Sequence, residues 1–599
     1  MDPSVSAFAV YQSKKNNKQK PNNKKRKVKK PVSRNGSAKN MKENALKELS
    51  LKLKRKQKKL KESKNIVKKK SLKKKKSKQV IRNEMNGQAP NMESCSSNNN
   101  QITVEQTTKI PKPPIVEEIP ELVPAPKIEK PEVDSACSCS SSDGFEFTPV
   151  TTHSKEEGLK VFTWMLTPFD PNEFLKEIWE KKPLHIARKK PDYYKDVIST
   201  PVIDNMLRTE NIQFTKNIDI TSYVDGKRET HNPEGRANPH LVWDFYLNGC
   251  SIRLLNPQTY VPQLHLLNAT LQEFFNSFVG ANAYLTPPDS QGFAPHYDDI
   301  EAFILQTEGK KHWRIYKPRD ESEILPRVPS KNFDESEIGE PVLEVVLEAG
   351  DMLYFPRGYI HQGVTIDGEH SLHVTISMYQ KHAWADLLEK MIPAALQIAI
   401  NENIEFREGL PLDIYDHFGL VHSDTNTPRK AEMEEIVKRL FNKIKDYLPI
   451  DEAVDQMNKK FQQDALPPVL SDFEKAVTVF GDSDVMIENG KVTNRVEIGL
   501  DTRIRLLRKN ILRIVSEERI KLYYYAENSL EYHGTELPFL EIEEDLAPAI
   551  ETLITTYPEY VSVENLDIPS DSDKIQISDA LWSRGLIMTE YPLETIDDE

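Results

Sequence analysis

Short apolar runs, separated by turns rich in glycine, proline and aspartate, follow one another through the middle of this chain. Residues 283–286, 342–347, 352–355 and 371–379 are four such runs, each of a length typical of a strand. A series of short strands with turns at regular spacing is typical of an antiparallel barrel or a jelly roll. The pattern therefore predicts an antiparallel β domain.

Two further runs flank a turn signal within the same region. Residues 301–307 are largely apolar, Glu308 and Gly309 follow, and residues 310–316 resume a strand pattern. Glycine next to a polar residue between two strand-like runs favours a tight turn. We therefore predict a β-hairpin, with residues 310–316 as its return strand.

Helical patterns follow the strands. Residues 384–401 are mostly apolar and are interrupted at Pro393. Residues 428–448 carry one helical stripe of apolar side chains, made by Met433, Ile436, Leu440, Ile444 and Leu448. Two such helices outside a barrel favour a homodimer interface, and the alternative is that they pack onto their own barrel.

The last part of the chain mixes strand and helix signals. Residues 494–498 and 520–525 have strand patterns, whereas residues 547–557 and 578–585 look helical. About 440 residues follow the N-terminal quarter, which is more than one hydrophobic core usually serves. We therefore expect two or three folded modules.

Composition completes this division of the chain. The fold class that we predict is α+β, with one disordered tail, one linker and three folded regions. The segments are residues 1–82 as a disordered lysine-rich tail, 83–157 as a disordered Ser/Pro-rich acidic linker, 158–382 as the barrel domain with a helix near 170–179, 383–454 as a helical region, and 455–599 as a C-terminal module.

Charge is distributed very unevenly. The first 80 residues hold 30 Lys and Arg against 4 acids, a net charge of +26, whereas the whole chain carries −11 and the remaining residues therefore −37. A segment so rich in lysine and so poor in aromatics cannot bury enough surface to fold alone. It favours import into the nucleus or nucleolus and non-specific contact with nucleic-acid phosphates, and the alternative is a solubilising tail without a partner.

Cysteine and apolar content exclude other classes. The chain has 4 Cys, and Cys137 and Cys139 lie in a serine-rich tract without a second pair nearby, so we expect neither a zinc site nor disulfides. The sequence has no secretory leader and no apolar run long enough to span a bilayer. We therefore expect an intracellular protein that is not inserted in a membrane.

His296, Tyr297 and Asp298, followed 65 residues later by His361, carry the candidate chemistry. Residues i and i+2 of a strand project from the same face, so His296 and Asp298 can reach one ion together if they lie in a strand. His361 would then come from another strand. Two imidazoles and one carboxylate on one side of Fe(II) form the facial triad of non-haem oxygenases, which leaves positions open for oxygen and a co-substrate.

A second His-x-Asp pair serves as an internal comparison. His422 and Asp424 lie in a polar turn that ends at Thr427 and Pro428, a typical helix start. No strand pattern surrounds this pair, so we interpret its side chains as solvated turn residues. Context, and not the motif alone, separates the two pairs.

Three stretches of the chain resemble a known family. Residues 284–303, 354–362 and 371–377, which include the first His-x-Asp pair and His361, are similar to the JmjC branch of the cupin-fold 2-oxoglutarate oxygenases. The resemblance is strongest to the nucleolar ribosomal oxygenases, the bifunctional lysine-specific demethylases and histidyl hydroxylases, and runs from about Gly158 to the C-terminus. It implies a double-stranded β-helix barrel, a helical dimerisation region and a winged-helix module. It also implies that His296, Asp298 and His361 hold Fe(II).

The same resemblance implies the residues that bind the co-substrates 2-oxoglutarate and O2. Lys311 lies 15 residues after His296 and aligns with the lysine of the family that meets the far carboxylate of 2-oxoglutarate. The alternative is a solvated surface lysine, which we favour for its neighbour Lys310. Asn282, Tyr284 and Ser377 align with residues of the co-substrate and substrate pocket, but each is equally open to being a satisfied strand residue.

Two other residues have ordinary structural readings. We interpret His373 as a hydrogen-bonded barrel histidine rather than a ligand, because apolar residues alternate around it. Arg253 would either guide a substrate peptide or pair with an acid.

The resemblance further implies the reaction. Hydroxylation of a histidine in a large-subunit ribosomal protein is the expected activity, with demethylation of methylated lysines of histone H3 as a second one, linked to ribosome biogenesis and transcriptional repression. Alternatives are a catalytically inert scaffold bound to chromatin or ribosomes, and a cupin acting on a small molecule. An intact set of candidate ligands counts against the scaffold. The basic tail and the chain length favour a macromolecular substrate.

The C-terminal module that the resemblance implies bears on nucleic-acid binding. Winged helices often touch DNA, but the acidic end of this chain opposes contact with phosphates. We therefore interpret the module as structural or protein-binding. One basic cluster argues the other way; it consists of Arg503, Arg505, Arg508, Lys509 and Arg513.

Overall fold

The structure is a computed structural model, and it describes residues 152–599 except 367, 482–485, 532–536 and 597–599. The predicted tail of residues 1–82 and nearly all of the predicted linker of residues 83–157 lie outside the described residues. Within the described part, no helix combines the length and apolar character needed to span a bilayer.

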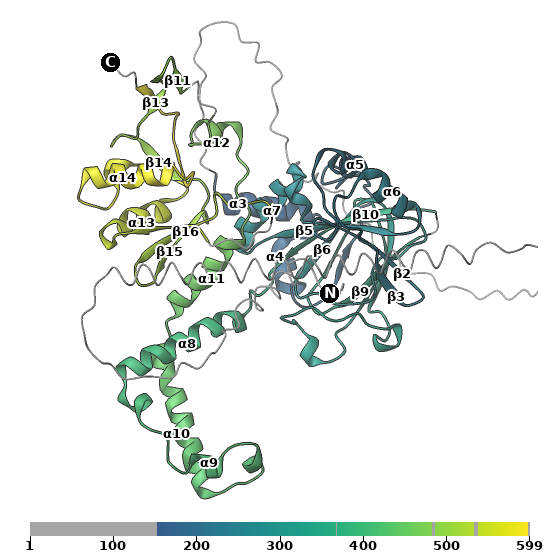
Figure 1. Cartoon of the computed structure of the whole chain (residues 1–599), viewed down its shortest axis with the longest axis horizontal. Coiled ribbons are helices and arrows are strands. Elements are labelled where there is room, and N and C mark those ends of the chain that lie inside the picture. The colour runs from purple at the N-terminus through teal and green to yellow at the C-terminus, as the bar shows by residue number, and fades with distance from the viewer. Residues whose placement is uncertain (1–151, 367, 482–485, 532–536, 597–599) are drawn as a thin grey trace, which may run out of the picture. The chain divides into compact units, whose positions relative to one another are not determined.

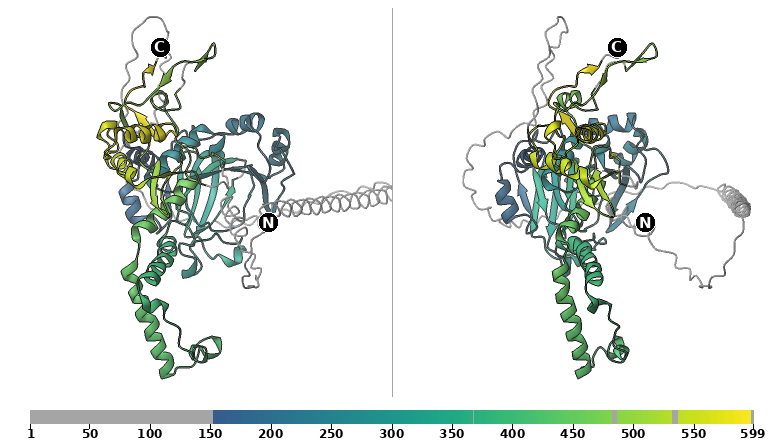
Figure 2. Two further views of the ribbon diagram at one scale, coloured as in Figure 1. Left: turned by 60° about the vertical axis from the view of Figure 1, so that its left-hand side comes forward. Right: turned by 90° about the vertical axis from the view of Figure 1, so that its left-hand side faces the viewer.

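Antiparallel strands form the predicted β domain (Figure 1). They pair in the order β1, β8, β6, β10, β5, β4, β2 and β3, and β7 and β9 also pair with β6. Figure 2 shows these strands, coloured blue to teal, from two further directions. Their bounds are β1 Leu184–Ile186, β2 Ile218–Val224, β3 Lys227–Thr230, β4 Ser251–Leu255, β5 Gly280–Thr286, β6 Glu301–Tyr316, β7 Leu343–Glu348, β8 Met352–Phe355, β9 Ile360–Thr365 and β10 Ser371–Met378.

Strand β6 corrects the predicted hairpin. Its 16 residues form one continuous strand, whose first half pairs with β8 and β10 and whose second half pairs with β7 and β9. Gly309 lies where the strand changes partners, with a φ of +63°, and a Cβ there would stand 1.8 Å from the carbonyl oxygen of His370. The register between β10 and β6 shifts two residues earlier, at Thr307. A glycine in a strand marks a bulge as readily as a turn, and the local sequence does not distinguish them.

Helix α3 (Ser154–Leu166) packs against helix α7 (Pro262–Phe275) beside the sheet, and Gly158 makes this approach possible. A Cβ at Gly158 would lie 2.7 Å from the carbonyl oxygen of Thr270. Helix α3 begins at Ser154, four residues before the expected start of the domain at residue 158. The capping residue is His153, which is not a usual helix-start signal.

Three shorter helices complete the β domain. Asp170 caps α4 by accepting hydrogen bonds from the backbone amides of Asn172 and Glu173, and the predicted helix near residues 170–179 is confirmed in place. The aromatic rings of Phe174, Phe303 and Tyr354 meet in the core, with centroids 4.8 to 5.7 Å apart. The bounds are α4 Pro171–Glu177, α5 Thr200–Thr209 and α6 Pro239–Leu247.

The helical region differs from the prediction in two places. Helix α8 runs through Pro393 without a break, because proline removes only one hydrogen bond of a helix whose other turns remain intact. The predicted boundary between residues 454 and 455 falls inside α11. The predicted stripe of residues 428–448 is helical as α10 and then continues as a short 3-10 turn. The bounds are α8 Trp384–Glu402, α9 Ile414–His417, α10 Pro428–Ile444 and α11 Ile450–Asp464.

The C-terminal module has a hydrophobic core of its own. Predicted strand 520–525 and helix 547–557 are confirmed as β16 and α13, but the strand at 494–498 has only two residues, and the last helix is 571–582 rather than 578–585. That helix starts early because the Ser570 hydroxyl caps it at the amide of Asp573. The bounds are α12 Asp472–Ala476, β11 Ile487–Glu488, β12 Lys491–Val492, β13 Arg495–Val496, β14 Arg503–Leu506, β15 Leu512–Ser516, β16 Ile520–Tyr524, β17 Phe539–Ile542, α13 Ala547–Thr556, β18 Val561–Ser562, α14 Asp571–Trp582, β19 Ile587–Thr589 and β20 Thr595–Ile596.

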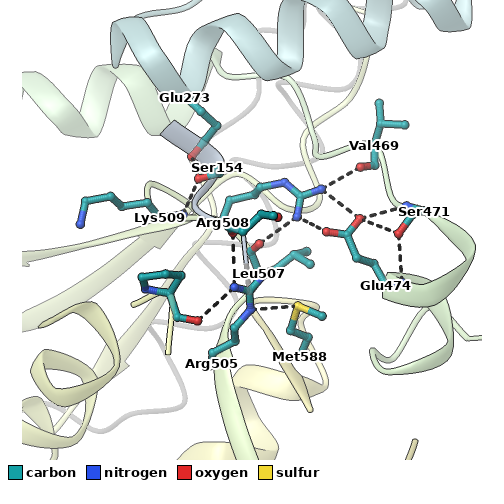
Figure 3. A network of polar contacts seen from close by, with 12 residues as sticks. Ser154, Glu273, Val469, Ser471, Glu474, Arg505, Leu507, Arg508, Lys509 and Met588 are labelled. Atoms are coloured by element: carbon teal, nitrogen blue, oxygen red, sulfur yellow. Dashed lines mark hydrogen bonds and ion pairs between the residues drawn. The ribbon is translucent and has the colours of Figure 1, made fainter. Parts of the chain in front are cut away.

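Most of the basic cluster of this module is engaged within the protein, and Figure 3 shows the contacts of Arg505 and Arg508. Arg505 is buried and donates to the carbonyl oxygen of Pro558, and Arg508 forms an ion pair with Glu474. Arg503 pairs with Glu590 and Arg513 with Asp455. Four of the five cations are therefore committed to internal contacts, which supports the structural interpretation of this cluster.

A buried carboxylate joins the module to the β domain. Glu273 on α7 accepts hydrogen bonds from the hydroxyls of Ser154 and Tyr525 and from the backbone amide of Asn510. Burial raises the pKa of this carboxyl. The main chain of Leu466, just after α11, is also bonded on both sides to the side-chain amide of Gln272.

Candidate metal centre

The three candidate metal ligands come from two segments that are bonded to each other. His296 lies in the loop between β5 and β6, and His361 is the second residue of β9. Their backbones form an isolated antiparallel bridge, with the amide of His361 donating to the carbonyl of His296 at 2.9 Å. The amide of Gly358 donates to the carbonyl of Asp298 at 3.1 Å. The prediction that His296 and Asp298 lie in a strand is therefore wrong, because a single bridge to β9 orders this loop.

The structure nevertheless brings the predicted ligands together. The Nε2 atom of His296 lies 3.9 Å from Oδ1 of Asp298, and Nε2 of His361 lies 3.8 Å from Oδ2 of the same carboxylate. One donor atom from each residue lies within 4.8 Å of the others. Two imidazole nitrogens and one carboxylate oxygen at these separations form a donor set for one divalent ion.

Backbone carbonyls fix the tautomer of both histidines. Nδ1 of His296 lies 2.9 Å from the carbonyl oxygen of Ala294, and Nδ1 of His361 lies 3.1 Å from that of Tyr359. A carbonyl only accepts, so each Nδ1 carries the hydrogen and each Nε2 presents a lone pair toward Asp298. Burial and the neighbouring His296 lower the pKa of His361 to about 4, which keeps this imidazole neutral at physiological pH.

A pocket with a volume of about 130 Å³ adjoins the three ligands. Alternate residues of three strands line it, because side chains two apart share one face of a strand. Strand β10 pairs with β5 in a register that places His373 opposite Tyr284 and Thr375 opposite Asn282. The lining side chains from these strands include Asn282 and Tyr284 of β5, Ile304, Lys311 and Trp313 of β6, and His373, Thr375 and Ser377 of β10.

Lys311 is the buried cation of this pocket. It is 5% exposed, and its Nζ donates to the hydroxyl of Thr286 at 3.2 Å and lies 5.6 Å from the ring of Trp313. No carboxylate pairs with it among the described residues, and burial lowers the pKa of Lys311 to about 7. Its neighbour Lys310 instead points to the surface, where it pairs with Glu348 and Glu369. Lys311 is thus buried whereas Lys310 is paired at the surface, and Lys311 lies farther along one continuous strand and not on a return strand.

The three weaker candidates also lie at the pocket. Asn282, Tyr284 and Ser377 all line it, and the Ser377 hydroxyl donates to the carbonyl of Gly280 at 3.3 Å. Thr286 and Trp313 were missed by the sequence reasoning. A period of two could have found them, since Thr286 follows Tyr284 on one strand face and Trp313 follows Lys311 on another.

The interpretation of His373 needs correction. Its ring stacks on that of Tyr284, with centroids 4.9 Å apart, and it lines the pocket. Its Nδ1 is buried and has no hydrogen-bond partner among the described residues, so His373 is not the satisfied barrel histidine that we expected. Burial lowers its pKa well below the usual value, which keeps the ring neutral.

Arg253 forms an ion pair, which was one of its two predicted roles, and it also lines the pocket. Its guanidinium pairs with Asp219, and the side chain lines the pocket beside Phe293. The second His-x-Asp pair behaves as predicted: Asp424 is exposed, and His422 ends a 3-10 turn far from any cluster of ligands among the described residues.

Sequence comparisons agree with this site. Residues 253–387 match the JmjC domain family, and residues 466–593 match the C-terminal winged-helix domain of ribosomal oxygenase 1. A bifunctional lysine-specific demethylase and histidyl-hydroxylase NO66 from Aedes aegypti is 52% identical over 432 residues, which cover 72% of this chain and 68% of the relative. The chain belongs to the ribosomal oxygenase 1/NO66 family of JmjC proteins. The family resemblance expected from the sequence is thus confirmed.

Another relative of this chain has a similar degree of identity. Ribosomal oxygenase 1 from Gallus gallus is 47% identical over 441 residues, 74% of this chain and 73% of the relative. Among solved structures, Escherichia coli ycfD has 15% identity and a TM-score of 0.39, covering 70% of this chain and 98% of its own. A score of this size does not establish a common fold. The JmjC match supports the antiparallel domain, and the winged-helix match supports the C-terminal module. Helix α11 ends two residues before the winged-helix match begins.

Proposed function

We propose that this chain is an Fe(II)- and 2-oxoglutarate-dependent protein oxygenase that hydroxylates a histidine of a large-subunit ribosomal protein. The observation that carries the proposal is the convergence of His296, Asp298 and His361 within 4.8 Å, with both Nε2 lone pairs facing the carboxylate. Family membership adds the substrate class, since the relatives are named for histidyl hydroxylation and lysine demethylation. The double-stranded β-helix of the cupins is the finer description that we propose for the β domain.

The donor set fits iron. Two imidazoles and one carboxylate on one side of an ion match the facial triad of Fe(II) oxygenases, whose remaining positions are open to ligands. His296, Asp298 and His361 would hold the metal, and the backbone bridge between the two histidines fixes their separation.

The neighbouring pocket fits 2-oxoglutarate. A buried ammonium without a carboxylate partner among the described residues is costly unless an anion joins it, and Lys311 is such a group. Two further polar atoms, Nε1 of Trp313 and Nδ1 of His373, are buried there without a hydrogen-bond partner among the described residues. A dicarboxylate would supply the missing charge and acceptors, so we propose Lys311 and Thr286 as its anchors. Asn282, Tyr284 and Ser377 would orient it.

When bound, iron, 2-oxoglutarate and O2 supply the oxidation of an otherwise inert C–H bond. The protein holds the three ligands together, keeps His361 neutral and surrounds the site with buried strand residues. Hydroxylation of a histidine carbon leaves a stable alcohol, whereas hydroxylation of an N-methyl group leads to loss of formaldehyde. The side chain that enters the pocket therefore decides the outcome, and demethylation of methylated lysines of histone H3 is the second activity that we propose.

The test uses the full-length chain with Fe(II), 2-oxoglutarate and peptides from ribosomal proteins or methylated histone H3. We expect peptide-dependent succinate and a histidine that gains the mass of one oxygen atom. His361→Ala should abolish both products, and His422→Ala, in the exposed turn of the second pair, should leave them unchanged. Equal activity of the His361→Ala protein would refute the oxygenase and favour the inert scaffold.

We also propose that a second copy of the chain covers the exposed apolar face of the helical region. Leu388, Ile392 and Leu396 recur at every fourth residue of α8 with 37% to 39% exposure, and Val437 and Phe441 of α10 are 62% and 57% exposed. So many partly exposed apolar side chains on two adjacent helices favour a protein interface. Val437→Asp with Phe441→Asp should convert a dimer into a monomer in light scattering, whereas Glu434→Lys on the same helix should not.

The charge of the N-terminal segment supports proposals about where the protein resides in the cell and about its contacts with nucleic acid. We propose that the protein resides in the nucleus and nucleolus and that residues 1–82 bind nucleic-acid phosphates without base specificity. Deletion of residues 1–82 should abolish nucleolar accumulation of a fluorescent fusion. In solution the same deletion should remove RNA binding whose affinity falls steeply with salt.

A further inference from the structure

A second cavity, which we call the side chamber, adjoins the pocket of the candidate metal centre. Its volume is about 340 Å³, and residues of the β domain and of helices α8 and α11 line it. Phe278 and Gln380 line both spaces, so each is part of the wall of the metal pocket and of the side chamber. The two spaces are therefore adjacent, so a chain that presents one residue to the metal centre has the side chamber beside it.

Some of the charged side chains around the side chamber form ion pairs, and others do not. The carboxylates of Asp386 and Glu389 both pair with Arg327 at 2.7 Å, and Asp464 pairs with Lys460. The exposed lysines Lys381 and Lys390 line the same chamber, and neither forms an ion pair with any carboxylate of the described residues. Both lysines also act electrostatically on Glu389, which shares Arg327 with Asp386. With Arg327, four cations face three carboxylates, so the chamber offers a ligand one net positive charge.

The walls of the side chamber are fixed by contacts on both sides. The side-chain amide of Gln380 donates to both carboxylate oxygens of Asp299, at 2.8 and 2.9 Å. Helix α11 is anchored at its end by the paired hydrogen bonds between Leu466 and Gln272 of the β domain. A rigid wall loses little freedom when a ligand binds, which favours a built subsite over a transient gap.

We infer that the side chamber binds the substrate polypeptide next to the modified residue and selects an aspartate or glutamate there through Lys381 and Lys390. This inference rests on the proposed function, and it adds a sequence preference that the metal centre alone does not impose. The ligand class follows from two observations. The chamber shares Phe278 and Gln380 with the metal pocket, and the two lysines that line it without an ion-pair partner among the described residues are cationic.

The experiment measures kcat/KM of the full-length protein on a peptide series. Each peptide carries one glutamate, placed in turn at every position on either side of the target residue, and a parallel series carries lysine at the same positions. In the wild-type protein we expect one position at which glutamate is preferred over lysine by about tenfold. The Lys381→Glu, Lys390→Glu double variant should reverse that preference, and Lys491→Glu, at an exposed site of β12, should keep it.

Each outcome decides a separate question. Reversal of the preference supports the side chamber, because damage to the fold would lower both series together. A preference that is absent in the wild type, or that survives in the double variant, overturns the inference and leaves the oxygenase proposal intact. If no peptide of either series yields succinate with the wild type, the proposed function itself fails. Light scattering of each variant checks that the oligomeric state is unchanged.

Discussion

Replacing Lys311 with methionine should make the protein without its co-substrate more stable and at the same time impair its binding of 2-oxoglutarate. Lys311 is 5% exposed, and among the described residues its ammonium has one hydrogen bond, to Thr286, at 3.2 Å. Methionine fills a similar volume without a charge. The two effects have opposite signs because the same burial that penalises the free ammonium strengthens its attraction for a bound anion.

The magnitude follows from the pKa. Burial lowers the pKa of Lys311 from 10.5 to about 7, and each pH unit corresponds to about 1.4 kcal/mol, so the penalty at pH 7 is about 4 kcal/mol. Loss of the hydrogen bond to Thr286 offsets about 1 kcal/mol of that gain. We therefore expect Lys311→Met to raise the free energy of unfolding by about 3 kcal/mol at pH 7.

The dependence on pH has a definite sign. Between pH 7 and 10.5 the unfolded chain binds more protons at Lys311 than the folded protein does, so the stability of the wild type rises with pH in this window. The advantage of Lys311→Met should therefore shrink as pH rises from about 7 and vanish near 10.5. Binding of 2-oxoglutarate requires the charged form, so the Kd of the wild type should increase about tenfold per pH unit above about 7.

Denaturation in urea at several pH values, together with calorimetric titration of 2-oxoglutarate, measures both effects. Removal of a buried charged partner costs about 2–5 kcal/mol of binding, so the Kd should rise by at least about thirtyfold. Lys310→Met is the matched control, because Lys310 pairs with Glu348 and Glu369 at the surface and should change neither quantity by much. An unchanged Kd, or a less stable Lys311→Met protein at pH 7, would refute the assignment of Lys311 as a buried anion anchor.

Three further predictions concern the ligands, the long strand and the contact between domains. His361→Ala removes one of two imidazole donors, so the Fe(II) affinity measured by competition with a chelator should fall by more than about a hundredfold. Gly309→Ala would place a Cβ 1.8 Å from the His370 carbonyl at a φ of +63°, so we expect a loss of at least about 2 kcal/mol in urea denaturation, whereas Gly409→Ala, in open space, should cost under about 0.5 kcal/mol. Burial raises the pKa of Glu273, so the wild type should lose stability relative to Glu273→Gln as pH rises from acid to neutral, and a difference that grows in the other direction would contradict this.

The sequence by itself determined the candidate chemistry. Its motifs identified His296, Asp298 and His361, and the structure brings their donor atoms within 4.8 Å. It also separated Lys311 from Lys310, and the ordered pair at His296 from the exposed pair at His422. Donor type and side-chain period are local properties, so residues close in sequence carry them.

Only the tertiary structure decided how those residues are held. Local signals predicted a hairpin at Gly309, but pairing with four other strands makes β6 one continuous strand with a bulge. The loop at His296 has no strand pattern of its own, and a bridge to His361, 65 residues away, orders it. The sequence left the role of the basic cluster open and led us to misjudge His373. The reason is the same, since ion pairing and burial depend on residues that are distant in the chain. Contacts of that kind are set by packing, which local sequence patterns do not record.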